Sequence, residues 1–237
     1  MDDNWGGVGG LALTAVKKGH RVVFLDTVGD YSMWPTTQGR EEQVGRRVAE
    51  LAEQHGIELR RLGYDYMHVP DDNEILTTLA EHTEDIQPDI LFFPWFADTN
   101  RDHWKTGLAG LYGCMRAPCF LARRTRVAAE AYAYELGSNQ CRNFRPEIYF
   151  DISEVFPELI ALPLEFDRIY AGAPDAGDTD PVLAEIEDLR PGRTYALSHH
   201  ARLLYALAVI RGSECGARYA EAFHAYHRRP IGRMLDL

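Results

Sequence analysis

Compact apolar runs and amphipathic segments alternate through the first part of the chain. The run from Arg21 to Thr27 is typical of a strand that is buried on both faces. Helices are predicted at Gly9 to Gly19, Glu41 to His55 and Asn73 to Asp85, and a second strand at Asp89 to Trp95. This β-α-β alternation predicts an α/β protein with a Rossmann-like three-layer fold, in which a mostly parallel central sheet carries helices on both faces.

The second half of the chain is less regular. Its predicted elements are strands at Val127 to Glu135 and Glu147 to Ile152, and helices at Ser153 to Phe166, Pro181 to Leu189 and Ser198 to Arg211. The segment Ala171 to Asp180 is rich in Ala, Gly, Asp and Pro and predicts a surface loop. We expect a single domain over residues 1–237, because this length suits one sizeable α/β core. The apolar helix from Ser198 suits either that core or the interface of a homo-oligomer.

The composition is that of a folded protein, with 46% apolar residues and a formal net charge of −11. This charge argues against nucleic acid, whose phosphates need a basic surface, and against anionic lipids. No apolar run is long enough to span a bilayer. Four cysteines without Cys-x-x-Cys spacing fit a reduced, cytoplasmic protein: Cys114, Cys119, Cys141 and Cys215.

Two acidic clusters suggest a catalytic metal site that is divided between distant parts of the chain. Asp2 and Asp3 stand just ahead of a Gly-x-Gly-Gly turn, and the segment from Asp98 to His103 places two further aspartates near a histidine. Zinc hydrolases hold the metal with three His or carboxylate ligands and leave one position for water. Of two adjacent aspartates, one can bind the metal while the other takes a proton from the water. His103 can bind through one ring nitrogen while Asp98 or Asp102 orients the ring.

Each of these features also has a purely structural interpretation. The pair Asp2-Asp3 can be a charged, frayed terminus. Asp102 can be the N-cap of a helix that has His103 in its first turn. The glycines can serve close packing alone. A nucleotide-binding loop is a weak match, because the later glycine and its acidic partner are missing.

The order of the motifs resembles that of the PIG-L/LmbE-like N-acetylglucosaminyl deacetylases. Their opening motif, His-Pro-Asp-Asp-x-x-x-Gly-x-Gly-Gly, is similar to the chain from Asp2 to Gly10, and the Gly-His that follows in the family is matched by Gly19-His20. A second family motif, a His shortly before an Asp-His pair, is similar to Asn100-Arg101-Asp102-His103. Later matches are Tyr134-Glu135, Phe144-Arg145-Pro146, Phe150-Asp151-Ile152-Ser153, Arg211-Gly212 and Tyr219 to Phe223.

The resemblance implies a role for individual residues. Carried over position by position, Asp2 is the general base, and Asp3 and His103 are zinc ligands. Asp102 matches an aspartate of the family that contacts the metal ligands and does not bind the metal itself. Arg40 matches, more loosely, an arginine that holds a sugar or phosphate group of the substrate.

The chain departs from the family pattern at two places. The first zinc-binding histidine of the family would lie immediately before Met1, and Met1 itself occupies the proline position. We therefore expect a copy that lacks the first strand and one of three protein ligands. Asn100 stands in place of a histidine that helps to stabilise the tetrahedral intermediate. We expect Asn100 to be a substrate-binding residue. Its amide can donate a hydrogen bond to an oxyanion, but it cannot carry a proton.

Taken together, the resemblance implies zinc-dependent hydrolysis of an N-acetyl group on an N-acetylglucosamine-type aminosugar or its conjugate. The alternative is a catalytically inactive carbohydrate-binding or regulatory relative that has lost its metal site. In both cases the expected partner is a small-molecule aminosugar or sugar conjugate. The cofactor implied for the enzyme is Zn²⁺.

Overall fold

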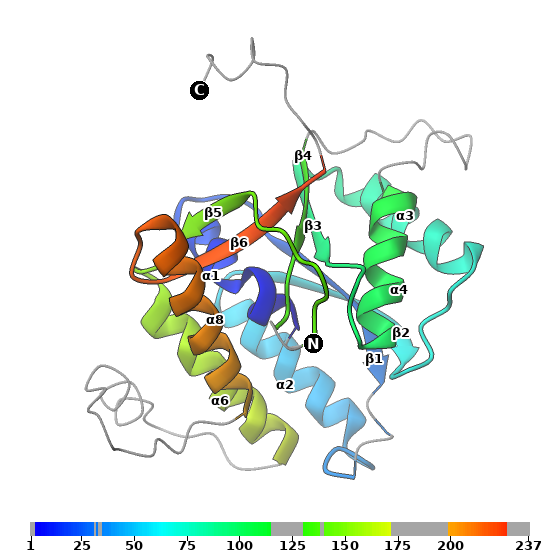
Figure 1. The fold of residues 1–237 in the computed structure, drawn as a ribbon. Helices are drawn as coiled ribbons and strands as arrows, with labels where there is room; N and C mark the ends of the chain where they lie inside the picture. Colours follow the sequence, from blue (N-terminus) through cyan, green and yellow to red (C-terminus); the bar gives the residue numbers. More distant parts are fainter. Residues whose placement is uncertain are drawn as a thin grey trace. The chain divides into compact units, whose positions relative to one another are not determined.

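The computed structural model describes residues 3–30, 32, 35–114, 130–137, 140–171 and 199–226. In chain order the elements are α1 (Asp3–Lys17), β1 (Val23–Asp30), α2 (Glu41–Gln54), β2 (Glu58–Asp65), α3 (Asn73–Ile86), β3 (Ile90–Pro94), α4 (Arg101–Ala109), the π-helix η1 (Gly110–Cys114), β4 (Glu130–Tyr134), β5 (Ile148–Asp151), α6 (Phe156–Ala171), α8 (His199–Cys215) and β6 (Ala220–Ala225) (Figure 1). None of the helices in these ranges is both long and apolar enough to cross a membrane.

The chain divides into two compact units, of which the first comprises Met1–His68 and Tyr149–Glu221. It contains the parallel pair β1 with β2, in which Val23 lies opposite Glu58. Helices α1, α2 and α8 all contact α6. Apart from Thr37, the largest fully buried side chains of this unit are apolar, and they include Leu13, Val44, Val48, Phe156, Leu159, Ile160 and Phe166. Helix α6 therefore lies at the centre of the core of this unit.

The second unit comprises Val69–Ile148 and Ala222–Leu237. Strands β3 and β4 run parallel, with Ile90 opposite Glu130, and β6 pairs antiparallel with β4. The four-stranded sheet has the strand order β3-β4-β6-β5, and residues 149–151 of β5 and 220–221 of β6 are counted with the first unit. Helix α3 contacts both η1 and α4, and α4 contacts β3. A buried cluster on the two parallel strands and just beyond β3 consists of Phe93, Trp95, Ala131 and Ala133.

The α/β class is confirmed, whereas the expectation of a mostly parallel central sheet is wrong. The described residues form two sheets, the parallel pair β1-β2 and a mixed sheet of four strands. The antiparallel pairing comes from β6, which the apolar pattern does not predict as a strand. Its sequence, Ala-Glu-Ala-Phe-His-Ala, contains no β-branched residue. The direction of a strand also depends on the partner it pairs with, which a local pattern does not encode.

Most other predicted elements lie at or near their expected positions. Gly19 and Gly56 follow α1 and α2 with φ of 83° and 71°, a region that favours glycine and ends both helices as predicted. Helix α1 begins at Asp3, ahead of its predicted start. Strand β2 was not predicted, because it is polar and half-exposed. The predicted helix from Pro181 to Leu189 and the predicted loop beyond Ala171 lie outside the described residues.

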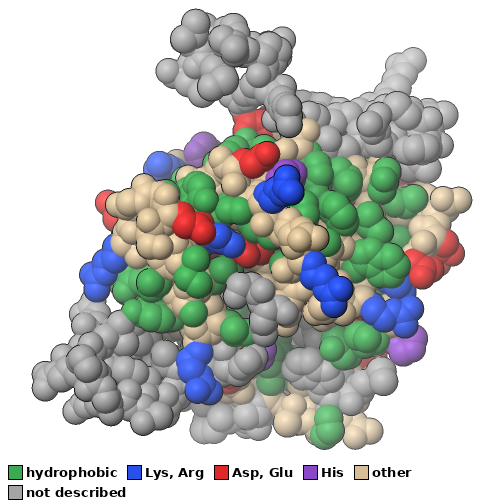
Figure 2. Space-filling view, in the orientation of Figure 1, with side chains coloured by type: hydrophobic (Ala, Val, Ile, Leu, Met, Phe, Trp, Pro, Cys, Tyr) green, Lys and Arg blue, Asp and Glu red, His purple; other side chains and the backbone are tan. Residues whose placement is uncertain are grey.

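Charged side chains of both signs are interspersed on the surface. On the face drawn in Figure 2, Lys and Arg side chains (blue) stand apart from one another among acidic, apolar and other groups. On the described part of that face these basic side chains form no continuous patch.

Candidate functional site

The residues predicted from the sequence to form the site fall into two groups. Asp3 and Arg40 belong to the first unit, whereas Asn100, Asp102 and His103 belong to the second. Asp2, the predicted general base, lies outside the described residues.

Asn100 begins helix α4. Its side-chain Oδ1 accepts a hydrogen bond from the backbone N–H of Asp102 at 2.9 Å, which is the usual contact of an N-cap residue. The N-cap is therefore Asn100, and the alternative in which Asp102 caps the helix is wrong. Asp102 lies in the first turn of α4 and is 4% exposed. A carboxylate at that position interacts favourably with the helix dipole.

His103 is held by a buried carboxylate. Its Nδ1 lies 3.2 Å from Oδ2 of Asp98, whose side chain is 1% exposed. Burial acts to raise the pKa of Asp98, but hydrogen bonds from His103 and from the backbone N–H of Asn100 outweigh it and lower the pKa below its usual value. An ionised carboxylate only accepts hydrogen bonds, so Nδ1 of His103 is the donor in this contact, and in a neutral ring with that proton Nε2 carries the lone pair. This is the form of histidine that binds a metal.

The segment around Cys141 fixes Asp98 in turn. The Cys141 thiol lies 3.4 Å from Oδ2 of Asp98, and the two residues also form an isolated antiparallel bridge. Burial raises the pKa of Cys141 to about 12, so the thiol stays protonated and acts as a donor rather than as a nucleophile. Three donors thus converge on one carboxylate: the imidazole of His103, the Cys141 thiol and the N–H of Asn100.

Close packing fixes α4 against the end of β3. A Cβ at Gly107 would lie 2.4 Å from the backbone oxygen of Pro94, so a larger residue requires the backbone to move. Lys105, on the same helix, is buried, and its Nζ donates to the backbone oxygen of Val69. His103 therefore lies on a helix that can shift little.

In the first unit, Asp3 occupies the first turn of α1 and is half-buried. The next residue, Asn4, donates from Nδ2 to Oδ1 of Asp26 at 2.7 Å. Asp26 belongs to β1 and is 5% exposed. This contact ties the start of α1 to the strand. The sequence pattern assigned no role to Asp26, although a carboxylate in the middle of an apolar run was a signal available there.

Arg40 binds the C-terminal end of α6. Its Nη2 donates to the carbonyl of Ile169 at 2.8 Å, and its Nη1 to those of Tyr170 at 3.3 Å and Thr36 at 2.9 Å. A cation at the last carbonyls of a helix also complements the helix dipole. These contacts are with the protein backbone, and binding of a sugar or phosphate group by Arg40 stays a prediction.

The donor types of Asp3 and His103 are those that zinc accepts, a carboxylate oxygen and an imidazole nitrogen. Among the residues that the structure describes, no group of three or more His, Cys, Asp or Glu side chains is clustered as a metal site would require. Of the two candidate ligands, Asp3 belongs to the first unit and His103 to the second.

No family model matches the chain, and no curated protein does. Several solved structures share its fold. TT1542, a conserved protein from Thermus thermophilus, has a TM-score of 0.71 and 20% identity over 97% of this chain and 92% of its own. N,N'-diacetylchitobiose deacetylase from Pyrococcus horikoshii has a TM-score of 0.65 and 20% identity over 98% of this chain and 85% of its own. GalB, the 4-carboxy-2-hydroxymuconate hydratase from Pseudomonas putida, has a TM-score of 0.67 and 16% identity over 97% of this chain and 94% of its own.

These similarities define the class of fold. Teicoplanin deacetylase Orf2, in a zinc-inhibited form, shares it as well, with a TM-score of 0.59 and 11% identity over 96% of each chain. The chain has the fold of the LmbE/PIG-L-type deacetylases, in agreement with the order of its motifs. Because a hydratase has this fold too, the fold alone does not determine the reaction.

Proposed function

We propose that this chain is a zinc-dependent deacetylase that hydrolyses the N-acetyl group of an N-acetylglucosamine-type aminosugar or its conjugate. The observation that carries the proposal is the pair of His103 and Asp98 at the start of α4, in which a buried carboxylate orients the imidazole through Nδ1. The order of the motifs and the fold shared with a diacetylchitobiose deacetylase support the same class of enzyme.

In this proposal His103 and Asp3 bind zinc, and the third protein ligand corresponds to the histidine that relatives carry before the aspartate pair. When bound there, zinc would polarise a carbonyl and would lower the pKa of a water molecule to about 7. Asp2 takes the proton from the attacking water and passes it to the departing amine. Asp102 supports His103 from the first turn of α4.

Asn100 and Arg40 are the proposed contacts to substrate. Oδ1 of Asn100 accepts from the N–H of Asp102, so its amide N–H groups are the donors offered to the acetyl oxygen. Such a donor stabilises negative charge on that oxygen without carrying a proton, which predicts slower catalysis than a histidine would give. To contact a sugar or phosphate, Arg40 has to release at least one of the backbone carbonyls that it binds.

The test compares the chain as it stands with a form in which His-Pro replaces Met1 behind a new initiator methionine. Zinc content after purification and acetate release from N-acetylglucosamine and N,N'-diacetylchitobiose are measured for both. We expect the His-Pro form to bind zinc and release acetate, and His103→Ala in that form to lose both. His20→Ala, at an exposed histidine, is the matched control and should change neither. If the His-Pro form purifies without zinc and never releases acetate, the proposal is wrong.

A non-catalytic carbohydrate-binding or regulatory protein is the second candidate. It is favoured by Asn100, which stands at a histidine position of the family motif and serves as a helix cap. Such a protein would bind N-acetylglucosamine equally well with and without EDTA, whereas the enzyme requires its metal. Calorimetric titration under both conditions separates the two candidates.

A further inference from the structure

Helix α1 is broken at Val8, where φ is −146° and ψ is 15°. The break separates a first segment, which carries Asp3 and Asn4, from a second segment that starts near Gly9. In a continuous helix each backbone N–H finds its acceptor four residues earlier. At a break this pattern is interrupted, and the N–H groups that open the second segment need other acceptors.

Glu221, in strand β6, supplies these acceptors. Its Oε1 accepts from the N–H of Gly10 at 2.6 Å, and its Oε2 from the N–H of Leu11 at 2.9 Å. Glu221 is 6% exposed. Burial raises its pKa to about 7, although the N–H groups of Leu11 and Gly10 act in the opposite direction. In the described chain no charged side chain contributes to that shift. A single buried carboxylate thus caps the second segment of α1.

The glycines at the break permit this contact. A Cβ on Gly10 would lie 2.5 Å from Cγ2 of Ile152, and a Cβ on Gly9 would lie 2.6 Å from Cδ1 of Leu159. Real Cβ atoms do not approach other atoms so closely. The backbone of α1 can therefore reach Glu221 only because both positions lack a side chain.

We propose that Glu221 is a positioning residue that fixes the break in α1 and thereby the direction of the first turn, which carries Asp3. A continuous helix would satisfy the amides of Gly10 and Leu11 internally and would align the first segment with the second. By binding both amides, Glu221 stabilises the broken form instead. The contact between Asn4 and Asp26 holds the start of the first segment independently. The consequence for zinc binding rests on the proposed function.

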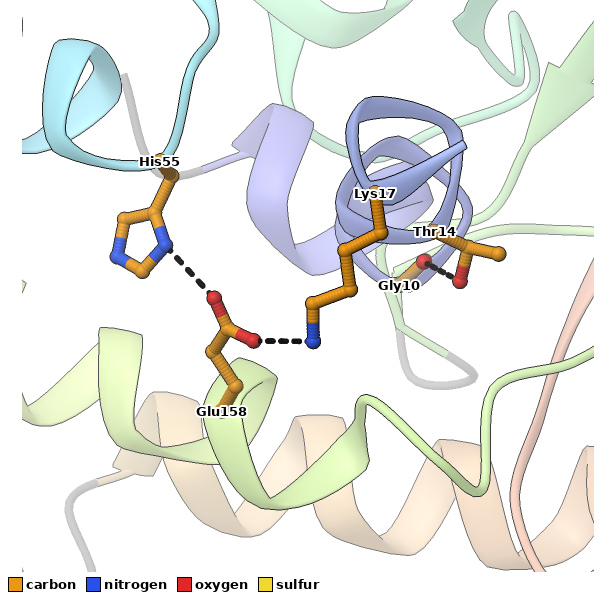
Figure 3. A network of polar contacts seen from close by, with 5 residues as sticks. All are labelled: Gly10, Thr14, Lys17, His55 and Glu158. Carbon is orange, nitrogen blue, oxygen red and sulfur yellow. Dashed lines mark hydrogen bonds and ion pairs between the residues drawn. The ribbon is translucent and has the colours of Figure 1, made fainter. Parts of the chain in front are cut away.

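Glu158 offers a matched control at the other end of the same helix. Its carboxylate binds Nζ of Lys17 at 2.7 Å and Nδ1 of His55 at 3.0 Å, and Figure 3 shows it pointing to both. Lys17 lies in the last turn of α1, away from the break. Replacing Glu158 therefore removes a carboxylate contact to α1 while leaving the contacts of Glu221 in place.

The experiment measures backbone hydrogen exchange and zinc affinity in the full chain in its His-Pro form, carrying Glu221→Gln, Glu221→Ala or Glu158→Gln. Glutamine keeps the size of the side chain but turns an NH₂ group toward one of the two backbone N–H groups. In Glu221→Gln we expect exchange at Leu11 and from Asn4 to Gly7 to rise about tenfold, as the loss of a hydrogen bond to a charged group implies. Zinc affinity should fall by a similar factor. In Glu158→Gln both quantities should stay within about twofold of the parent, as for an exposed ion pair.

Unchanged exchange from Asn4 to Gly7 in a folded Glu221→Gln protein would overturn the proposal. Faster exchange with unchanged zinc affinity would overturn it as well, because the first turn would then not need Glu221 to present Asp3. If Glu221→Ala fails to fold, the glutamine variant decides the question. If the His-Pro form without these substitutions binds no zinc, the proposed function fails, and the exchange comparison by itself decides whether Glu221 positions the first turn.

Discussion

The two groups of candidate site residues are held in different ways. In the second unit, His103 receives its helix cap and its carboxylate partner from residues close to it in sequence, Asn100 and Asp98. In the first unit, Asp3 lies at the end of a broken helix whose polar anchors, Asp26 and Glu221, come from strands distant in sequence. The candidate histidine is thus held by local contacts, whereas the position of the aspartate depends on long-range ones.

Removing the carboxylate next to His103 should have the largest effect. In Asp98→Ala we expect zinc affinity to fall by roughly 10- to 100-fold, because Nδ1 loses its acceptor and the tautomer is no longer fixed. Competition with a chromophoric chelator measures the affinity. Asp89→Ala, at an exposed aspartate of the same unit, is the control. Equal affinities of the two variants would show that local contacts do not prepare His103 for a metal.

Alanine at packed glycines compares the rigidity of the two helices directly. Gly107→Ala places a Cβ 2.4 Å from the backbone oxygen of Pro94, whereas Gly10→Ala meets the side chain of Ile152 at 2.5 Å. Overpacking typically costs about 1–3 kcal/mol of unfolding free energy, and we expect Gly107→Ala at the upper end because a backbone atom cannot rotate away. Urea denaturation measures both. Gly45→Ala, which meets only the end of a flexible arginine, should cost least. A larger loss for Gly10→Ala than for Gly107→Ala would reverse the comparison.

The buried carboxylate of Glu221 should make the stability of the chain depend on pH. Its pKa is raised from 4.5 to about 7 in the folded chain, so the folded state binds more protons between these values. The free energy of unfolding contributed by this group is therefore full below pH 4.5, falls as the pH rises through about 7, and then stays constant. Glu221→Gln removes this dependence. The melting temperature of the parent relative to Glu221→Gln should be higher at about pH 5 than at about pH 8. An equal difference at both pH values would contradict the raised pKa.

The cap of α4 should give the smallest of these effects. Asn100→Ala removes the acceptor for the N–H of Asp102 and should lower the free energy of unfolding by about 1 kcal/mol. Asn100→Asp retains an acceptor, so we expect its stability to lie close to that of the parent. Urea denaturation of the two variants checks this. Equal free energies of unfolding for Asn100→Ala and Asn100→Asp would show that the cap does not contribute to holding His103.

Some of the candidate site could be predicted because its parts are close together in the chain. Asp98, Asn100, Asp102 and His103 lie within six residues of one another, so a helix start that carries a histidine and a nearby carboxylate follows from the sequence. The sequence does not decide between Asp98 and Asp102 as the partner of Nδ1, because both lie within reach of the ring. That choice depends on the bridge between Asp98 and Cys141, which brings two distant segments together.

The sequence by itself determined the α/β class, helices α2 and α3, the glycines that end two of the helices, and the order of the motifs. These follow from periodicity and turn residues, which act over a few neighbouring positions. Only the tertiary structure decided that β6 runs antiparallel to β4, that Arg40 binds the end of α6, and that Glu221 caps a break in α1. Glu221 and Gly10 are 211 residues apart in the chain. A contact over such a separation forms only when the chain folds back on itself, and no local pattern records where it will do so.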